Sequence, residues 1–188
     1  GARAAGYETA VFDAGHARIA PCLGCGACGM GGTCVQKDDM GKLREEIAKG
    51  NIEKANHLLG YHYFVTGEIL HGRHLGSTKL GIPTINQIPP EEKLLPESGV
   101  YVTEVRLGDR SCRGVTNVGV KPTIEGKNPV GVETHLLDFA GDLYGKVVTV
   151  EFLTRIREER KFSSIEALKE EMQNNIAYAR AWFEKNES

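Results

Sequence analysis

The chain has 188 residues, of which 40% are hydrophobic and 26% are charged, a composition typical of a protein that folds around one apolar core. Its 23 basic and 25 acidic residues give a formal net charge of −2, which excludes a general electrostatic attraction to nucleic acid or to anionic membranes. No apolar run approaches the roughly 20 residues of a membrane span, so we expect a cytoplasmic protein that binds neither nucleic acid nor membranes.

The first part of the chain divides into a cysteine-rich segment, residues 1–41, and a helical linker, residues 42–62. Over residues 42–59 apolar side chains recur at helical spacing, and Gly50 and Asn51 interrupt them. This pattern predicts two short helices joined by a turn.

Residues 63–188 form the remaining part, which starts with short β-rich runs and ends with a helix. Gly, Pro, Asn and Asp separate the runs and no helical pattern lies between them, which favours an antiparallel barrel or sandwich. The runs are residues 63–70, 100–107, 114–120, 131–139 and 147–156. Residues 163–185 predict an amphipathic helix that begins at Ser163 or Ser164 and covers the barrel. Its apolar stripe comprises Ile165, Leu168, Met172, Ile176, Ala179 and Phe183.

A glycine-rich loop occurs in the segment HGRHLGSTKLGIPTIN, residues 71–86. Its glycines allow backbone amides to approach a phosphate closely, and Lys79 supplies a positive charge. Thr84 and Asn86 alternate along an extended segment, so their side chains face the same way. Their oxygens suit Mg²⁺, which prefers hard oxygen ligands. The spacing does not match a P-loop, and a plain hairpin loop that ends in a buried Thr and Asn is the alternative.

A carboxylate occurs inside one predicted strand, in the segment VGVETHLLDF, residues 130–139. Strand alternation places Glu133 and His135 on one face and their apolar neighbours on the other. A carboxylate at an inward-pointing position of a barrel is costly unless it is solvated or paired, so Glu133 is a candidate for binding or base chemistry. A solvent-facing glutamate is the alternative. We expect His135 to be structural, because no second ligand lies nearby at metal spacing.

Over residues 42–183 the chain resembles the riboflavin kinase module of bacterial FAD synthetases. The matching segments include GKLREEIAKGNIEKANHLLGYHYFVTGEILHG, LGIPTIN, SGVYVTEVRL, GVTNVGVKPTI, VETHLLDFAGDLYGKVVTVEFL and IREERKF. The resemblance implies a mainly β fold, a six-stranded Greek-key antiparallel barrel with a C-terminal helix and a short helical, Cys-rich N-terminal extension. It also implies a riboflavin kinase, which uses Mg²⁺ and ATP to phosphorylate the terminal ribityl hydroxyl of riboflavin and gives FMN and ADP.

The resemblance further implies roles for individual residues. Glu133 would accept the proton of the attacking hydroxyl, and Thr84 and Asn86 would bind Mg²⁺ and the phosphates of ATP. The other nucleotide-binding positions would be Gly72, Ser77, Lys79, Gly81, Pro83, Asn117 and Gly119. The flavin would meet a flap that carries Arg157, Glu159 and Phe162.

The linker, residues 42–62, resembles the end of the adenylyltransferase domain that precedes the kinase module in that family. The HxGH type of motif of that domain does not occur in the sequence, so we do not expect FAD synthesis. We expect a monomer whose partners are the small molecules riboflavin and ATP.

Four of the five cysteines, Cys22, Cys25, Cys28 and Cys34, have the spacing C-x₂-C-x₂-C-x₅-C. Residues 1–40 resemble part of a flavodoxin-like NAD(P)H-dependent FMN reductase or iron–sulfur flavoprotein, and the thiolates suit an iron–sulfur cluster or Zn²⁺. We favour the alternative of an inert or fused loop without metal, because one strand and one loop cannot close a doubly wound domain. The competing function is a flavin-binding electron-transfer protein related to FMN reductases.

Overall fold

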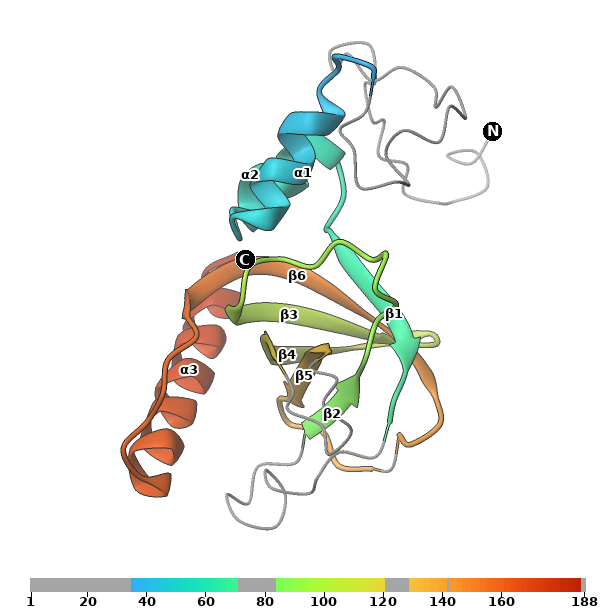
Figure 1. Ribbon diagram of the computed structural model, residues 1–188. Helices are drawn as coiled ribbons and strands as arrows, with labels where there is room; N and C mark the ends of the chain where they lie inside the picture. Colours follow the sequence, from blue (N-terminus) through green and yellow to red (C-terminus); the bar gives the residue numbers. More distant parts are fainter. Residues whose placement is uncertain (1–34, 71–83, 121–128, 142, 187–188) are drawn as a thin grey trace.

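The computed structural model describes residues 35–70, 84–120, 129–141 and 143–186. These residues form two short helices, α1 (Met40–Ala48) and α2 (Ile52–Leu59), and a long C-terminal helix, α3 (Ile165–Asn186). They also form six strands: β1 (Phe64–Glu68), β2 (Thr84–Gln87), β3 (Gly99–Leu107), β4 (Arg110–Val120), β5 (Val130–Leu136) and β6 (Val147–Glu158) (Figure 1). The predicted helix pair is confirmed, and Gly50 makes its turn with a positive φ of 71°, a conformation that glycine adopts without strain.

The strands form one antiparallel sheet in the order β1-β6-β3-β4-β5-β2, in which β6, β3, β4 and β5 have the 4-1-2-3 arrangement of a Greek key. The sheet curls until its edges meet: the amide of Leu70, after β1, donates to the carbonyl of Asn86 in β2 at 2.8 Å. Nε2 of the buried Gln87 donates to the carbonyls of Gly67 (2.8 Å) and Val148 (3.1 Å). The predicted six-stranded barrel is confirmed, and among the described residues these few bonds close its last seam.

The inner face of the barrel holds the apolar core. Strand β5 contributes Val132 and Leu136 to it, and the buried Thr134 hydroxyl between them hydrogen-bonds the Thr116 hydroxyl at 2.8 Å. Glu133 and His135 consequently point to the outer face, toward α3, and the expectation of an inward carboxylate is wrong. The interior of this small barrel is filled by apolar and hydroxyl side chains, where an ionised carboxylate would be costly.

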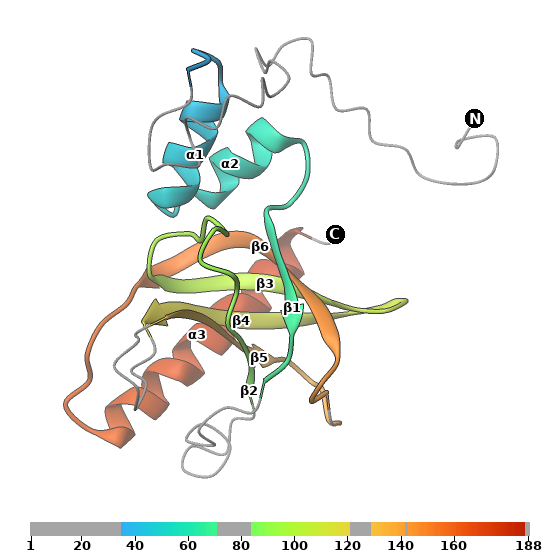
Figure 2. The ribbon, with the colours of Figure 1, turned by 45° about the vertical axis from the view of Figure 1, so that its right-hand side comes forward.

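Helix α3 covers part of the outer face of the sheet (Figure 2). It begins after Ser164, whose Oγ accepts from the Ala167 amide at 3.1 Å, one of the two caps that the sequence predicts. Ala179 and Phe183 of the predicted stripe are buried against β3, β4 and β6. Ile165 differs, because it lies in the first turn and is 50% exposed.

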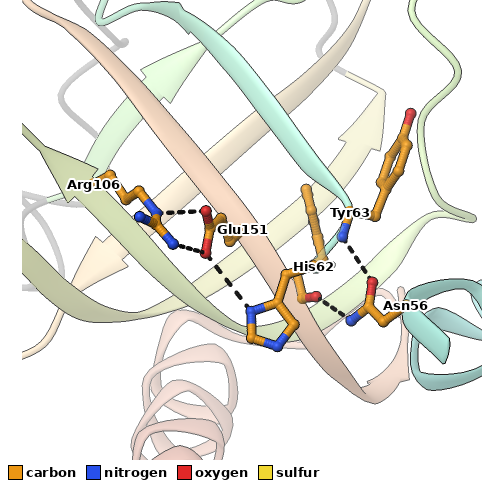
Figure 3. Close-up of polar contacts among 6 residues, drawn as sticks. Asn56, His62, Tyr63, Arg106 and Glu151 are labelled. Carbon is orange, nitrogen blue, oxygen red and sulfur yellow. Dashed lines mark hydrogen bonds and ion pairs between the residues drawn. The ribbon is translucent and has the colours of Figure 1, made fainter. Parts of the chain in front are cut away.

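The helix pair packs on the barrel through α2. Asn56 bridges β6 and the residue before β1: its Nδ2 donates to the Phe152 carbonyl at 2.8 Å, and its Oδ1 accepts from the Tyr63 amide at 2.7 Å (Figure 3). Nearby, Glu151 of β6 forms a two-point contact with Arg106 of β3.

Within the described residues, no helix combines the length and the apolar character that crossing a membrane requires.

Candidate active site

A cleft of about 310 Å³ lies between the outer face of the sheet and the N-terminal half of α3. The curled sheet supplies one wall, the segment after β6 supplies a second, and α3 supplies a third. The lining residues are Thr84, Val100, Val115, Asn117, Glu133, His135, Arg157, Glu159, Arg160, Phe162, Leu168, Met172, Asn175 and Ile176. The cleft therefore combines a polar floor with an apolar wall, which is the usual composition of a small-molecule site.

Glu133 lies at the centre of the polar floor. Asn86 on β2 and Asn117 on β4 are its register partners on the two neighbouring strands. The Thr84 hydroxyl donates a hydrogen bond of 2.8 Å to Glu133 Oε1. All four side chains are half-buried, so the carboxylate is held by neighbours and stays accessible to a ligand. This arrangement suits a base that orients a substrate hydroxyl.

The end of β6 and the segment after it bring a second group of residues over the cleft. We call residues 157–162 the flap. Arg157 and Arg160 lie against the ring of Phe162, with guanidinium-to-centroid distances of 5.5 and 5.2 Å, the range of cation–π contacts. Burial lowers the pKa of Arg157, and the nearby Glu171 carboxylate partly offsets this effect. Glu159 lies so close to Gly119 that a Cβ there would be 2.4 Å from its Oε1, so a larger residue at that position would displace the Glu159 carboxylate.

A second hollow, of about 390 Å³, shares Thr84 with the cleft. Its described lining is mostly apolar and comes from the residue after β1, from β2 and β5, and from the connection to β6: Ile69, Thr84, Ile85, Leu136, Phe139, Ala140, Gly141, Leu143 and Tyr144. Two ligand-sized spaces therefore share Thr84, whose hydroxyl hydrogen-bonds Glu133 in the cleft.

The structure brings together most of the predicted site residues that it describes. Thr84, Asn117, Glu133, Arg157, Glu159 and Phe162 line one cleft, with Asn86 and Gly119 beside it. The predicted residues Gly72, Ser77, Lys79, Gly81, Pro83, Cys22, Cys25, Cys28 and Cys34 lie outside the described residues.

Sequence reasoning did not assign several cleft residues to the site. Leu168, Met172 and Ile176 were predicted only as core positions of the helix, yet they form the apolar wall. Arg160 and Asn175 also line the cleft. Helical periodicity places Leu168, Met172 and Ile176 on the apolar side of the helix. Only the packing of α3 shows that its N-terminal half lines a cleft while its C-terminal half is buried.

The donor set around Glu133 fits Mg²⁺. A hydroxyl and an amide oxygen, from Thr84 and Asn86, are hard oxygen ligands on one strand beside the Glu133 carboxylate, and Mg²⁺ takes few protein ligands when phosphates complete its coordination shell. No cluster of three or more His, Cys, Asp or Glu side chains suited to a metal occurs within the described ranges. Any metal here therefore depends on the substrate for most of its ligands.

Comparisons with known proteins agree on one family. The model of the riboflavin kinase (flavokinase) family matches residues 59–183. The bifunctional riboflavin kinase/FMN adenylyltransferase of Pseudomonas fluorescens is 41% identical over 140 residues, which are 74% of this chain and 44% of that protein. The protein of the same name from Escherichia coli strain K12 is 38% identical over 142 residues, 75% of this chain and 44% of that protein.

A solved structure has the same fold. The crystal structure described as a macrolide-efflux protein from Streptococcus pneumoniae superposes with a TM-score of 0.70 at 32% sequence identity. The match covers 76% of this chain and 46% of that one. The chain thus spans less than half the length of the curated relatives and of this structural relative.

Proposed function

Because the chain belongs to the riboflavin kinase family, we propose that it transfers the γ-phosphate of ATP to the terminal ribityl hydroxyl of riboflavin and releases FMN and ADP. The observation that carries the proposal is the Thr84–Glu133 hydrogen bond at the junction of two ligand-sized spaces. Phosphoryl transfer needs two substrates that meet in line at a charged, well-positioned centre.

Glu133 acts as the base in this proposal. The ribityl oxygen attacks the γ-phosphorus while its proton passes to the Glu133 carboxylate. The bond from the γ-phosphorus to the β,γ-bridging oxygen breaks, and that oxygen keeps the electron pair and leaves with ADP. The hydrogen bond from Thr84 at 2.8 Å fixes the orientation of the carboxylate, and a positioned base contributes roughly 10²–10⁴-fold to such a reaction.

Thr84 and Asn86 would hold Mg²⁺, since their oxygens flank Glu133 on the adjacent strand. When bound, Mg²⁺ neutralises charge on the phosphates and orients the transferred group. The protein itself contributes a rigid strand, β2, whose alternate side chains carry the two oxygens on one face.

The two spaces differ in chemistry and suit different substrates. The cleft has an apolar wall on α3 and the aromatic ring of Phe162 on the flap, so we assign the isoalloxazine ring of riboflavin to it. The second hollow, on the other side of Thr84, is lined by Phe139 and Tyr144, which suits the base of the nucleotide. The predicted loop residues Gly72, Ser77, Lys79, Gly81 and Pro83 stay assigned to the phosphates of ATP.

The test is the formation of FMN from riboflavin by the purified chain with ATP and Mg²⁺. We expect Glu133→Gln to lower kcat by at least about 100-fold, because it removes the base and keeps the shape, while riboflavin binding persists. Glu104→Gln, another strand glutamate on β3 away from the cleft, is the matched control and should retain activity. Absence of FMN with the unaltered chain would refute the kinase proposal, and near-normal turnover of Glu133→Gln would refute the base alone.

The curated relatives carry a second activity, FMN adenylyltransferase. They therefore give no support to our expectation of no FAD synthesis, and this chain spans only 44% of each of them. The same assay, with FAD measured beside FMN, addresses it directly.

We propose that the cysteine segment takes no part in phosphoryl transfer, because the cleft to which we assign the transfer has its described lining on β2 to β6, the flap and α3. Zinc and iron analysis of the purified chain, together with its visible spectrum, tests the alternative of a Zn²⁺ or iron–sulfur site at Cys22, Cys25, Cys28 and Cys34. The proposed location is the cytoplasm, where ATP is available, and the proposed state is a monomer.

A further inference from the structure

Glu171 of α3 pairs with two arginines of the flap. Its Oε1 lies 2.8 Å from Arg157 Nε, and its Oε2 contacts Arg160 Nη2. The side chains of Glu171 and Arg157 are only 16% and 18% exposed, whereas that of Arg160 is 55% exposed. One carboxylate thus balances a largely buried cation and a surface cation at the same time.

The two arginines connect Glu171 to the lining of the cleft. Arg157 Nε also donates to Oδ1 of the buried Asn175 at 3.3 Å, and both guanidinium groups lie against the ring of Phe162. Arg157, Arg160 and Phe162 line the cleft, and Glu171 is not among the described residues that do. Any effect of Glu171 on the described lining of the cleft therefore passes through these partners.

We propose that Glu171 is a positioning residue, which sets the flap residues Arg157, Arg160 and Phe162 in the place where they hold the flavin ring. The inference rests on the proposed function. Its physical reason is that, without the Glu171 carboxylate, the hydrogen bonds of the largely buried Arg157 guanidinium go only to neutral groups, the Asn175 amide and the Glu158 carbonyl. A poorly compensated charge at that site costs free energy unless the guanidinium turns toward water. Arg157 and the Phe162 ring that packs on it would then leave the wall of the cleft.

The measurement is the equilibrium binding of riboflavin and of FMN, followed by the quenching of flavin fluorescence. We expect Glu171→Gln to raise the dissociation constants of both flavins alike, about tenfold, because loss of a charge-assisted pair is worth about that factor. The ring is common to both ligands, so both should be affected equally. The KM for ATP should change less than twofold. Glu170→Gln, an exposed neighbour on the same helix, removes the same charge and should leave both dissociation constants unchanged.

A double variant separates positioning from a general effect of charge. If Glu171 acts through Arg160 and Arg157, then Glu171→Gln combined with Arg160→Gln should lose less than the product of the two single losses. Additive losses, unchanged flavin binding in a folded Glu171→Gln, or an equal loss in Glu170→Gln would each overturn the inference. Tighter FMN binding in Glu171→Gln would also overturn it, since that result indicates charge balance toward the product phosphate.

Two further results keep the test decisive. If Glu171→Gln does not fold, Arg160→Gln on its exposed side chain replaces it, and unchanged riboflavin binding there overturns the inference. An unaltered chain that binds neither flavin and forms no FMN refutes the proposed function. Normal binding by the unaltered chain with normal binding by Glu171→Gln refutes only the role of Glu171.

Discussion

At the scale of single residues, the Thr84 hydroxyl is the donor that holds the Glu133 carboxylate in place. The bond is 2.8 Å long and joins β2 to β5. The sequence motif marked both residues as candidates, 49 positions apart, but only strand pairing shows that they touch. The same pairing puts Asn86 and Asn117 on either side of the carboxylate, a contact that no local pattern could predict.

We predict that Thr84→Val lowers kcat/KM for ATP by about 10- to 100-fold. Valine keeps the shape of threonine but leaves the carboxylate without its hydrogen bond, and a bond to a charged group is worth roughly that factor. Steady-state kinetics with varied ATP provide the measurement. Thr66→Val, which removes an exposed strand hydroxyl that bonds Thr149, is the control, and an equal loss in it would show that the effect is not specific to the site.

At the scale of elements, the pair α1 and α2 is fixed to the barrel and not merely tethered to it. Asn56 of α2 satisfies a carbonyl of β6 and the amide of Tyr63 just before β1, and the Thr154 hydroxyl of β6 donates to Glu53 Oε1. The sequence predicted these helices correctly from their periodicity. It described them as a linker, because periodicity carries no information on what a helix packs against.

We predict that Asn56→Ala lowers the free energy of unfolding by about 2 kcal/mol, because two backbone groups lose a partner at about 1 kcal/mol each. Denaturant unfolding followed by circular dichroism measures this loss. The adjacent, exposed His57→Ala should change stability by less than about 0.5 kcal/mol. A loss of equal size in both variants would show that the effect is not specific to the bridge, since alanine raises helix propensity at both positions.

At the scale of the whole molecule, two tyrosine hydroxyls fasten the connection between β2 and β3 to the rest of the fold. The Tyr63 hydroxyl donates to the Leu94 carbonyl, and the Tyr101 hydroxyl donates to the Glu97 carbonyl. Burial raises the pKa of both tyrosines to about 12, from an ordinary value of 10. The folded state therefore keeps both hydroxyls neutral in a pH range where the unfolded chain ionises them.

We predict that the protein loses stability as the pH rises from 10 to 12. A folded pKa above the unfolded pKa gives a contribution that is complete below pH 10 and is lost as the pH passes through 12, at up to about 1.4 kcal/mol per pH unit for each tyrosine. Urea unfolding at pH 9, 10, 11 and 12 measures the slope. Tyr63→Phe should reduce that slope and Tyr178→Phe, on an exposed position of α3, should not; equal slopes in all three proteins would contradict the prediction.

The predicted domain boundaries at residues 41 and 62 stay predictions. The contacts of Asn56 and Glu53 with β6 argue for including α2 in the folded body that carries the cleft. Limited proteolysis, which cleaves where the backbone opens, would locate the boundary experimentally.

The sequence by itself determined the β-rich class, the helix pair and the C-terminal helix with its cap, and it marked Thr84, Asn86 and Glu133 as candidate site residues. These features depend on periodicity, turn residues and short motifs, which are local. The tertiary structure alone decided that Glu133 points outward, that α3 supplies the apolar wall of the cleft, and that Glu171 holds two arginines of the flap. Each of these follows from which strands pair and which face a helix covers, and such long-range packing is set by the free energy of the whole fold and by no single stretch of sequence.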